Sequence, residues 1–359
     1  MAKIIISTLL IWIAIFLTFP SNAKPNYKII IDADLHQNAD DHEALVMLVN
    51  LQKQKFLEIL GVTIVAGNHN LNQIEVDTLR IIERLKLEKE LLVYKGADRP
   101  LLHNKETFNR FDKARYGSEY AGAWTESETI KEPMDGMPTL KVQDKHAVNY
   151  IIDTVRENPN EVTLVALGPL TNIALAFRLA PDIIPLTKSI IYMGGSAFFH
   201  GNVTPSAEFN WWFDAEAADI VLSQEMEHII IPLDATDKLL FNIDIYNHLV
   251  NTYPEHMMTK MYLLPKFKDV FAKNPQYTIP VWDALVPVYM YAPDIVSEEK
   301  ELWINVDSNR GPSYGRSIAL PIRNKAEKPY FETQKAKVIL SMDEIKFWDM
   351  YETLIFKLN

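Results

Sequence analysis

Short apolar runs alternate with amphipathic segments through the first quarter of the chain. The run over 28–31 predicts a strand, and the segment 41–52 carries apolar residues at helical spacing. A strand over 57–66, a helix over 71–85 and a strand over 91–94 are predicted next. Because apolar strands of about four to eight residues alternate with helices, the order is typical of a parallel α/β sheet.

The alternation stops between residues 95 and 138, where charged, aromatic and glycine residues follow one another without periodicity. A loop of that length within a domain is usually functional, often as a lid or a substrate-binding flap. After it, strands are predicted over 162–167, 189–193 and 228–232, and a hairpin over 303–340. The helices predicted in this part lie at 146–157, 170–179, 215–223, around 246–271, 283–292 and 344–357.

The N-terminus has the pattern of a signal peptide. Lys3 precedes an almost unbroken apolar run over 4–19, and the stretch 21–23 (Ser-Asn-Ala) has the small residues of a cleavage site. The run is shorter than the about 20 residues that a spanning helix needs. We expect residues 1–23 to be a signal peptide of an exported protein, periplasmic or secreted, with an uncleaved anchor as the alternative. Residues 24–359 are predicted to form one α/β domain with an open, mostly parallel sheet flanked by helices.

Composition and charge exclude several classes of function. The 359 residues carry 36 basic and 47 acidic side chains, a net charge of −11, and no dense run of Lys and Arg. Nucleic acids and anionic membrane surfaces favour a basic stripe, so neither is an expected partner. The chain contains no cysteine, which excludes disulfides, thiolate ligands and a cysteine nucleophile. Any metal would be held by oxygen or imidazole.

Four aspartates gather within ten residues at the end of the first predicted strand: Asp32, Asp34, Asp40 and Asp41. Ligands of open α/β sheets bind at the carboxyl ends of the strands. Carboxylates this close repel one another, and a bound hard cation relieves the repulsion. One of the last two also fits the N-cap of the following helix. Since capping needs only one carboxylate, the pattern favours a metal site, with Asp283 as a further candidate ligand.

A series of motifs between about residues 28 and 320 resembles the nucleoside hydrolases. The motifs follow the order of that family: 32–34 with 40–41, 61–63 with 65–68, 96–101, 167–172, 193–195, 201–205, 207–210, 214 with 216–218, and 283–285. A single acidic pair would be weak support, whereas an ordered series is specific. The resemblance implies the nucleoside hydrolase fold, a mostly parallel α/β sheet with a Rossmann-like core.

The resemblance also implies hydrolysis of the N-glycosidic bond of ribonucleosides, which gives ribose and the free base. It implies one Ca²⁺ that chelates the ribose 2′- and 3′-hydroxyls. Asp34 would bind this ion and act as the general base for the attacking water. The other implied calcium ligands are the carboxylates of Asp41 and Asp283, the latter also touching ribose, and the carbonyl of Leu167. The implied contacts to the sugar are Asp40 and Asn68 at the hydroxyls, Asn202, Glu208 and Asn210 around the rest, and Met193 under the ring.

These residue types agree with the implied chemistry. Glycosidic cleavage passes through an oxocarbenium-like transition state, and anionic side chains around the ribose stabilise its positive charge. Carboxylate and carbonyl oxygens are the ligands that calcium prefers. A bound dication also lowers the pKa of water, which helps a carboxylate base at neutral pH.

Trp282 departs from the pattern of the inosine–uridine-preferring members, which have a histidine before the last aspartate. A tryptophan here is similar to the purine-specific members, where an aromatic ring stacks on the purine and raises its proton affinity. The alternative is that Trp282 packs against the core. Tyr116 lies near the place of the other family histidine, and Tyr120 and Trp124 would join it over the base. Five residues, 35–39, separate Asp34 from Asp40, where many members of the family have three.

The sequence therefore predicts a calcium-dependent ribonucleoside hydrolase that prefers purines and assembles as a homodimer or homotetramer. Its predicted partner is a small ribonucleoside substrate. Two alternatives stay open at this point: a pyrimidine-preferring or broad-specificity hydrolase, and a nucleoside-binding protein that has lost turnover.

Overall fold

The computed structural model describes residues 26–36, 39–87, 91–112, 124, 130–323 and 333–358. The predicted signal peptide lies outside these residues. Within the part of the chain that is described, no helix has both the length and the apolar character needed to cross a membrane.

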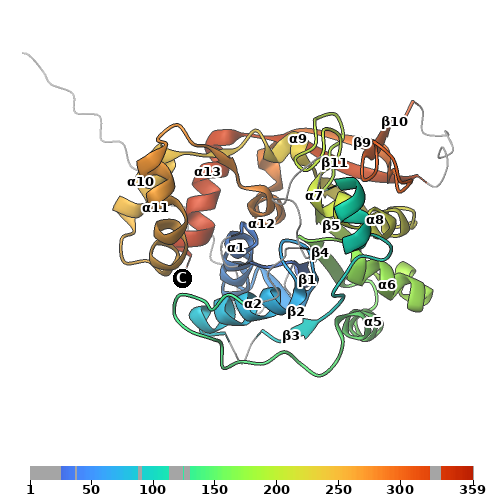
Figure 1. The fold of residues 1–359 in the computed structure, drawn as a ribbon, viewed down its shortest axis with the longest axis horizontal. Helices are drawn as coiled ribbons and strands as arrows, with labels where there is room; N and C mark the ends of the chain where they lie inside the picture. Colours follow the sequence, from blue (N-terminus) through green and yellow to red (C-terminus); the bar gives the residue numbers. More distant parts are fainter. Residues whose placement is uncertain are drawn as a thin grey trace, which may run out of the picture.

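A large, mostly parallel sheet runs through the described residues (Figure 1). Its strands are β1 (Tyr27–Ala33), β2 (Leu57–Ile64), β3 (Val93–Lys95), β4 (Val162–Ala166), β5 (Ser189–Met193), β6 (His228–Ile231), β9 (Val296–Val306), β10 (Ser317–Pro321) and β11 (Gln334–Met342). Their order across the sheet is β10-β9-β11-β6-β5-β4-β1-β2-β3. From β3 to β11 all neighbouring strands pair in parallel. β9 is antiparallel to both of its neighbours, β10 and β11. The predicted fold class is confirmed.

Both faces of the central strands β1, β4, β5 and β6 are buried, which explains why these strands are apolar runs. Ile29 and Ile31 of β1 belong to one core, and Ile30 belongs to the other. The helices of the first core are α1 (Asp41–Lys53), α2 (Leu71–Leu85), α10 (Ile243–Thr252), α11 (Leu264–Lys273), α12 (Leu285–Tyr291) and α13 (Glu344–Glu352). Those of the second core are α5 (Ala147–Glu157), α6 (Thr171–Leu179), α7 (Phe209–Phe213) and α8 (Ala215–Leu222).

Shorter elements connect these layers. They are the single-turn helices α3 (Lys105–Thr107) and α9 (Leu233–Thr236), the π-helical turns η1 (Phe108–Asp112), η4 (Thr259–Leu263) and η7 (Thr353–Lys357), the 3-10 turns η3 (Pro181–Leu186), η5 (Trp282–Ala284) and η6 (Pro293–Ile295), and the strand pair β7 (Leu240–Phe241) and β8 (Ile279–Pro280).

The C-terminal strands differ in part from the predicted hairpin. β9 and β10 are antiparallel neighbours, as a hairpin requires, but β11 pairs with the other edge of β9 and joins β6 in parallel. This arrangement connects the antiparallel edge to the parallel sheet. It arises from a long-range pairing that the local pattern does not show.

Candidate active site

The carboxyl ends of the central strands place residues from distant parts of the chain at one edge of the sheet. β4, β1 and β2 are adjacent and parallel. Asp34 follows β1, Asn68 follows β2 and Leu167 follows β4, while Met193 is the last residue of β5. The alternation of strands and helices predicted this edge as the ligand site.

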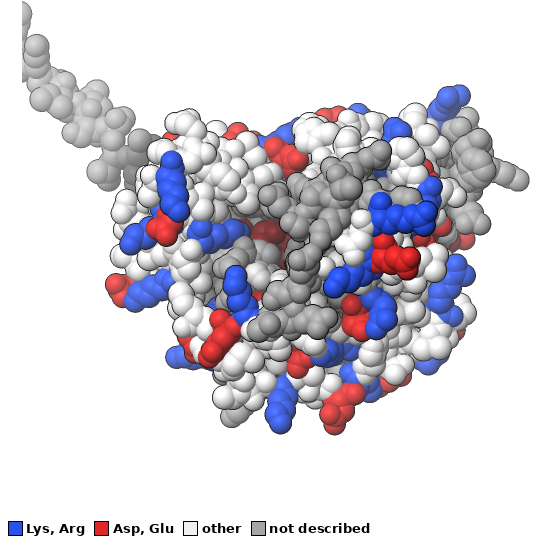
Figure 2. All heavy atoms as spheres, viewed as in Figure 1, with Lys and Arg blue, Asp and Glu red and all other residues white. Residues whose placement is uncertain are grey.

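A cavity of about 340 Å³ opens at this edge. It is lined by Asp40, Asn68, Leu167, Met193, Asn202, Glu208, Phe209, Asn210, Trp282 and Asp283. Every lining residue except Phe209 is one that the sequence analysis assigned to the site. Figure 2 shows acidic atoms deep in a hollow near the centre of this face. The cavity is large enough for a small polar ligand, and one side of it is strongly acidic.

Three carboxylates form a tight trio at the wall of the cavity. Oxygen atoms of Asp40, Asp41 and Asp283 all lie within 4.8 Å of one another. The backbone N–H of Asp283 donates to Asp40 Oδ2 at 2.8 Å, which joins η5 to the start of α1. The side-chain amide of Asn68 donates to Asp41 Oδ2 at 3.1 Å. The trio contains Asp40, which the sequence analysis assigned to ribose, and it does not include Asp34.

Asp34 lies buried behind this trio. Its Oδ2 accepts the backbone N–H of Asn68 at 2.5 Å, and its Oδ1 has no hydrogen-bond partner among the described residues. Gly67 and Gly168 pack so closely on this carboxylate that a Cβ at either position would collide with it. Burial raises the pKa of Asp34 to about 8.

The charges of the trio raise one another's pKa. Burial is the largest cause for Asp41 and Asp283, and the neighbouring carboxylates add to it, so both pKa values lie well above the ordinary range. Asp41 Oδ1 also lacks a hydrogen-bond partner within the described part of the chain. Unpaired, buried carboxylate oxygens that repel one another fit a hard dication, and the donor set is of the kind that suits calcium.

Glu208 organises the opposite wall from the start of α7. Its carboxylate accepts three backbone N–H groups, those of Gly195 at 2.9 Å, Asn210 at 2.7 Å and Trp211 at 3.1 Å. Burial raises the pKa of Glu208 to about 7, although these hydrogen bonds oppose the shift. The three bonds fix the carboxylate in place at the cavity surface.

Asn210 connects this wall to the sheet. Its side-chain amide donates to the carbonyls of Leu167 at 3.0 Å and Met193 at 3.3 Å. Asn202 accepts the backbone N–H of Phe209 at 3.0 Å. The carbonyl of Leu167, a predicted metal ligand, therefore already has one polar partner.

Trp282 forms part of the cavity wall beside Asp283. Its ring is half-buried and packs partly against the core, and the residue also lines the cavity, so its position is compatible with both interpretations. The indole Nε1 donates to Asp237 Oδ1 at 3.0 Å, which fixes the plane of the ring. An aromatic surface in this position can stack on a planar group in the cavity.

Comparison with known proteins decides the family. The model of the family described as inosine-uridine preferring nucleoside hydrolase matches residues 29–349. The chain belongs to the nucleoside hydrolase family. A similar relative is the pyrimidine-specific ribonucleoside hydrolase RihB of Escherichia coli, 31% identical over 330 residues that make up 91% of this chain and 96% of the relative. This hydrolase is accordingly an enzyme that cleaves the N-glycosidic bond of ribonucleosides, as predicted.

Solved structures share the fold of the hydrolase. A plant nucleoside hydrolase superposes with a TM-score of 0.75 at 22% identity, covering 92% of this chain and 99% of its own. A purine-preferring ribonucleoside hydrolase from Gardnerella vaginalis gives a TM-score of 0.69 at 24% identity, covering 92% and 98%. At these identities the likeness concerns the fold.

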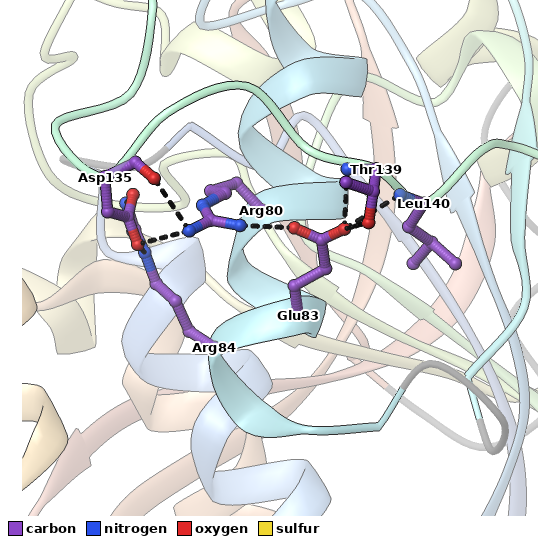
Figure 3. Close-up of polar contacts among 6 residues, drawn as sticks. All are labelled: Arg80, Glu83, Arg84, Asp135, Thr139 and Leu140. Carbon is purple, nitrogen blue, oxygen red and sulfur yellow. Dashed lines mark hydrogen bonds and ion pairs between the residues drawn. The ribbon is translucent and has the colours of Figure 1, made fainter.

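Part of the predicted flap of the hydrolase is tied to α2 (Figure 3). Glu83 accepts the backbone N–H of Thr139 at 2.7 Å, and Arg84 donates to both oxygens of Asp135 at 2.6 and 3.0 Å. The end of the predicted flap is therefore anchored on the outer surface of a core helix. We call the contacts of Glu83 and Arg84 with residues 135–140 the α2 anchor.

Of the three aromatic residues predicted to cover the base, the structure describes only Trp124. Tyr116 and Tyr120 lie outside the described residues. Trp124 stacks on Phe213 with ring centroids 6.0 Å apart and is not among the residues that line the cavity. In this structure Trp124 is therefore a packing residue of the second core.

Phe209 and Asp237 are the site residues to which sequence reasoning gave no role. Phe209 stands between Glu208 and Asn210 in a matched motif, and this position could have indicated that it lies at the site. Asp237 had no signal, because its link to Trp282 joins positions 45 residues apart.

Proposed function

We propose that this nucleoside hydrolase is calcium-dependent and prefers purine ribonucleosides. The observation that carries the preference is the Trp282 ring, which lies on the cavity wall next to the acid trio and is held by Asp237. A purine offers a stacked aromatic ring more surface than a pyrimidine does. Stacking also stabilises a protonated base, which makes the base a better leaving group.

The proposed calcium ligands are the carboxylates of Asp34, Asp41 and Asp283 and the carbonyl of Leu167. The buried, unpaired oxygens of Asp34 and Asp41 support this assignment. Asp40 belongs to the trio and would lie between the ion and the ribose hydroxyls. When bound, the dication would lower the pKa of a ligated water. Asp34 would take the proton from the attacking water, and its Oδ1, which has no partner among the described residues, supports that role.

The proposed ribose contacts come from both walls of the cavity. Asp40 and Asn68 would bind the hydroxyls next to the trio, and Asn202, Glu208 and Asn210 would bind the sugar from the α7 side, with Met193 beneath it. All six line the cavity. Carboxylates on two sides of the ring would stabilise the positive charge that develops on ribose in the transition state.

A second candidate function is pyrimidine-specific hydrolysis. The observation that favours it is the 31% identity to a relative described as a pyrimidine-specific ribonucleoside hydrolase. The two candidates share the bond that is cleaved and the ribose and metal sites. They differ in what the base-binding side of the cavity accepts.

Steady-state kinetics on inosine and uridine separate the two candidates. For the wild-type enzyme, kcat/KM should be larger for inosine. Trp282→Ala should lower kcat/KM for inosine by about fivefold or more, since the loss of stacking contact costs about 1 kcal/mol or more, and should affect uridine less. Trp282→Phe, which keeps an aromatic face, is the matched control. A wild-type enzyme faster on uridine contradicts the purine preference, and equal losses on both substrates assign Trp282 to core packing.

Export and homo-oligomer formation are further proposals for this chain. The apolar segment 4–19 and the small residues that follow it support export.

A further inference from the structure

A lysine from α11 reaches into the interior next to the first turn of α1. Lys266 Nζ donates to the hydroxyl of Tyr262 at 2.6 Å and lies 4.7 Å from the centre of the Tyr262 ring and 5.0 Å from that of Phe267. The two rings cover the ammonium group and limit its contact with water. A lysine held in such surroundings needs nearby negative charge.

The negative charge is supplied by α1. Glu43 is fully buried, and the hydroxyls of Tyr262 and Tyr351 hydrogen-bond to its carboxylate. Tyr262 therefore links Lys266 to Glu43 through two hydrogen bonds. Glu43 stands two positions after Asp41 in the first turn of the helix that begins the acid trio.

The charge of the lysine also acts on two members of the trio. Asp40 and Asp41, together with Glu43, attract its charge and oppose the lowering of its pKa by burial. On the other side, the charge of Lys266 contributes to the lowered pKa of His36. Lys266 is thus a positive charge that shares the buried region of the carboxylates from which the proposed metal site is built.

We propose that Lys266 is the internal counter-charge of the acid trio, a positioning residue that stabilises the first turn of α1 before the metal binds and lowers the affinity of the site for a dication. The proposal rests on the metal site of the proposed function and adds a residue outside its ligand set. Tyr262 and Glu43 are the groups that hold the ammonium in place.

The expected effect follows from Coulomb's law. In general, a unit charge about 10 Å from a dication, at an effective dielectric constant of about 20 to 40, changes the binding constant of the dication by about tenfold or more. Removing Lys266 should therefore strengthen calcium binding. It should also destabilise the calcium-free protein, because the carboxylates of α1 then repel one another without compensation.

Calorimetric titration of the full-length protein with calcium tests the proposal. Lys266→Met should bind calcium about tenfold more tightly than the wild type, and Lys266→Arg, which keeps the charge, should bind like the wild type. The double variant Lys266→Met/Glu43→Gln removes one charge of each sign and should return the affinity toward the wild-type value. Loss of a merely structural residue would not strengthen binding.

Thermal unfolding provides a second measurement, including for Lys266→Gln, which keeps a hydrogen-bond donor for Tyr262. In both uncharged variants the Tm without calcium should fall, and the increase in Tm on adding calcium should exceed that of the wild type. Unchanged or weaker calcium binding in Lys266→Met and Lys266→Gln, with normal binding by the wild type, overturns the role of Lys266 alone. A wild-type protein that binds no calcium contradicts the metal site of the proposed function, and this proposal with it.

Discussion

Asp32 lies in β1 and Asp34 lies just after it, and the two side chains have different surroundings. Asp32 points into the core, where its Oδ1 accepts hydrogen bonds from Thr63 at 2.5 Å and Asn172 at 2.8 Å, and burial raises its pKa to about 6. Each carboxylate has one oxygen without a partner among the described residues, Oδ2 in Asp32 and Oδ1 in Asp34. Asp34 differs in its place, because it stands beyond the end of the strand and accepts the backbone N–H of the cavity residue Asn68. Asp32 is thus a structural link between β1, β2 and α6, and Asp34 is the candidate for chemistry.

Asp34→Ala should lower kcat by about a thousandfold or more, because it removes both the proposed base and a proposed metal ligand. Ribose release from the preferred nucleoside measures the effect. Asp182→Asn, an exposed carboxylate paired with Arg156, is the matched control and should retain full activity. Near-normal turnover by Asp34→Ala would show that the assignment of the base is wrong.

The sequence motifs identified residues of the site but not how their side chains are arranged. The motifs identified Asp34, Asn68 and Glu208 as site residues. Asn68 and Glu208 line the cavity, and Asp34 is bonded to the backbone N–H of Asn68. The motifs did not distinguish Asp40 from Asp34 as a member of the tight trio. That difference depends on side-chain directions within a five-residue loop, which the sequence pattern does not specify.

At the scale of elements, the single turn α9 after β6 holds two parts of the site. Asp234 accepts the backbone N–H groups of Ala197 at 2.7 Å and Phe198 at 2.8 Å, in the loop after β5. Asp237, just after the same turn, accepts Trp282 Nε1. One short element therefore positions a loop at the cavity edge and the proposed stacking ring.

Asp237→Ala should lower kcat/KM for inosine by about threefold to tenfold and change uridine less, because the Trp282 ring loses the bond that fixes its plane. Kinetics on both nucleosides measure the change. Asp237→Asn keeps an acceptor oxygen and should behave like the wild type. An equal loss on both substrates in Asp237→Ala would assign the residue to stability rather than to base preference.

The contacts of Glu83 in the α2 anchor can be tested by substitution. Hydrogen bonds from Thr139, Leu140 and Arg80 outweigh partial burial and lower the pKa of Glu83 to about 2, so the anchor should persist at pH 4. Glu83→Ala should increase hydrogen exchange at the amides of residues 139 and 140 by about tenfold or more. The amide of Tyr150 in α5, which bonds to His146, is the control and should not change. Unchanged exchange at 139 and 140 would contradict the anchor.

Elements with a clear period were predictable at nearly their observed bounds. The predicted helix over 71–85 is α2 itself, because its apolar stripe is regular and Asn70 caps its start. The helix α7 was not predicted, since Phe209–Phe213 is apolar almost throughout and shows no period. The helical region around 246–271 divides into α10, η4 and α11, with Pro254 in the turn after α10.

At the scale of the whole molecule, the parallel sheet determines the site. Asp34, Asn68, Leu167 and Met193 meet because β1, β2, β4 and β5 are parallel neighbours that end at the same edge. The strand–helix alternation predicted this edge as the ligand site, and the resemblance to the nucleoside hydrolases supplied Asn68, Leu167 and Met193. The role proposed for Lys266 was not predictable from the sequence. Lys266 and the first turn of α1 are more than 200 residues apart in the chain, and only the tertiary fold brings them together.

The carboxylates of the site make stability depend on pH, and under the proposed function calcium acts on the same groups. Asp34 and Glu208 have raised pKa values, about 8 and about 7, so between pH 4 and pH 8 the folded protein binds more protons than the unfolded chain. Their contribution to the free energy of unfolding therefore falls as the pH rises through this window. Calcium competes with these protons, so the increase in Tm on adding calcium should grow from pH 5 to pH 8. An increase that is independent of pH would contradict a site made of buried carboxylates.

Calcium-dependent release of ribose tests the central claim most directly. The purified enzyme is assayed on inosine in the presence of calcium, after chelation, and after calcium is restored. We predict release with calcium, a loss of at least about a hundredfold after chelation, and recovery when calcium is added back. Full activity after exhaustive chelation, or no release of ribose from any ribonucleoside despite bound calcium, would contradict the account.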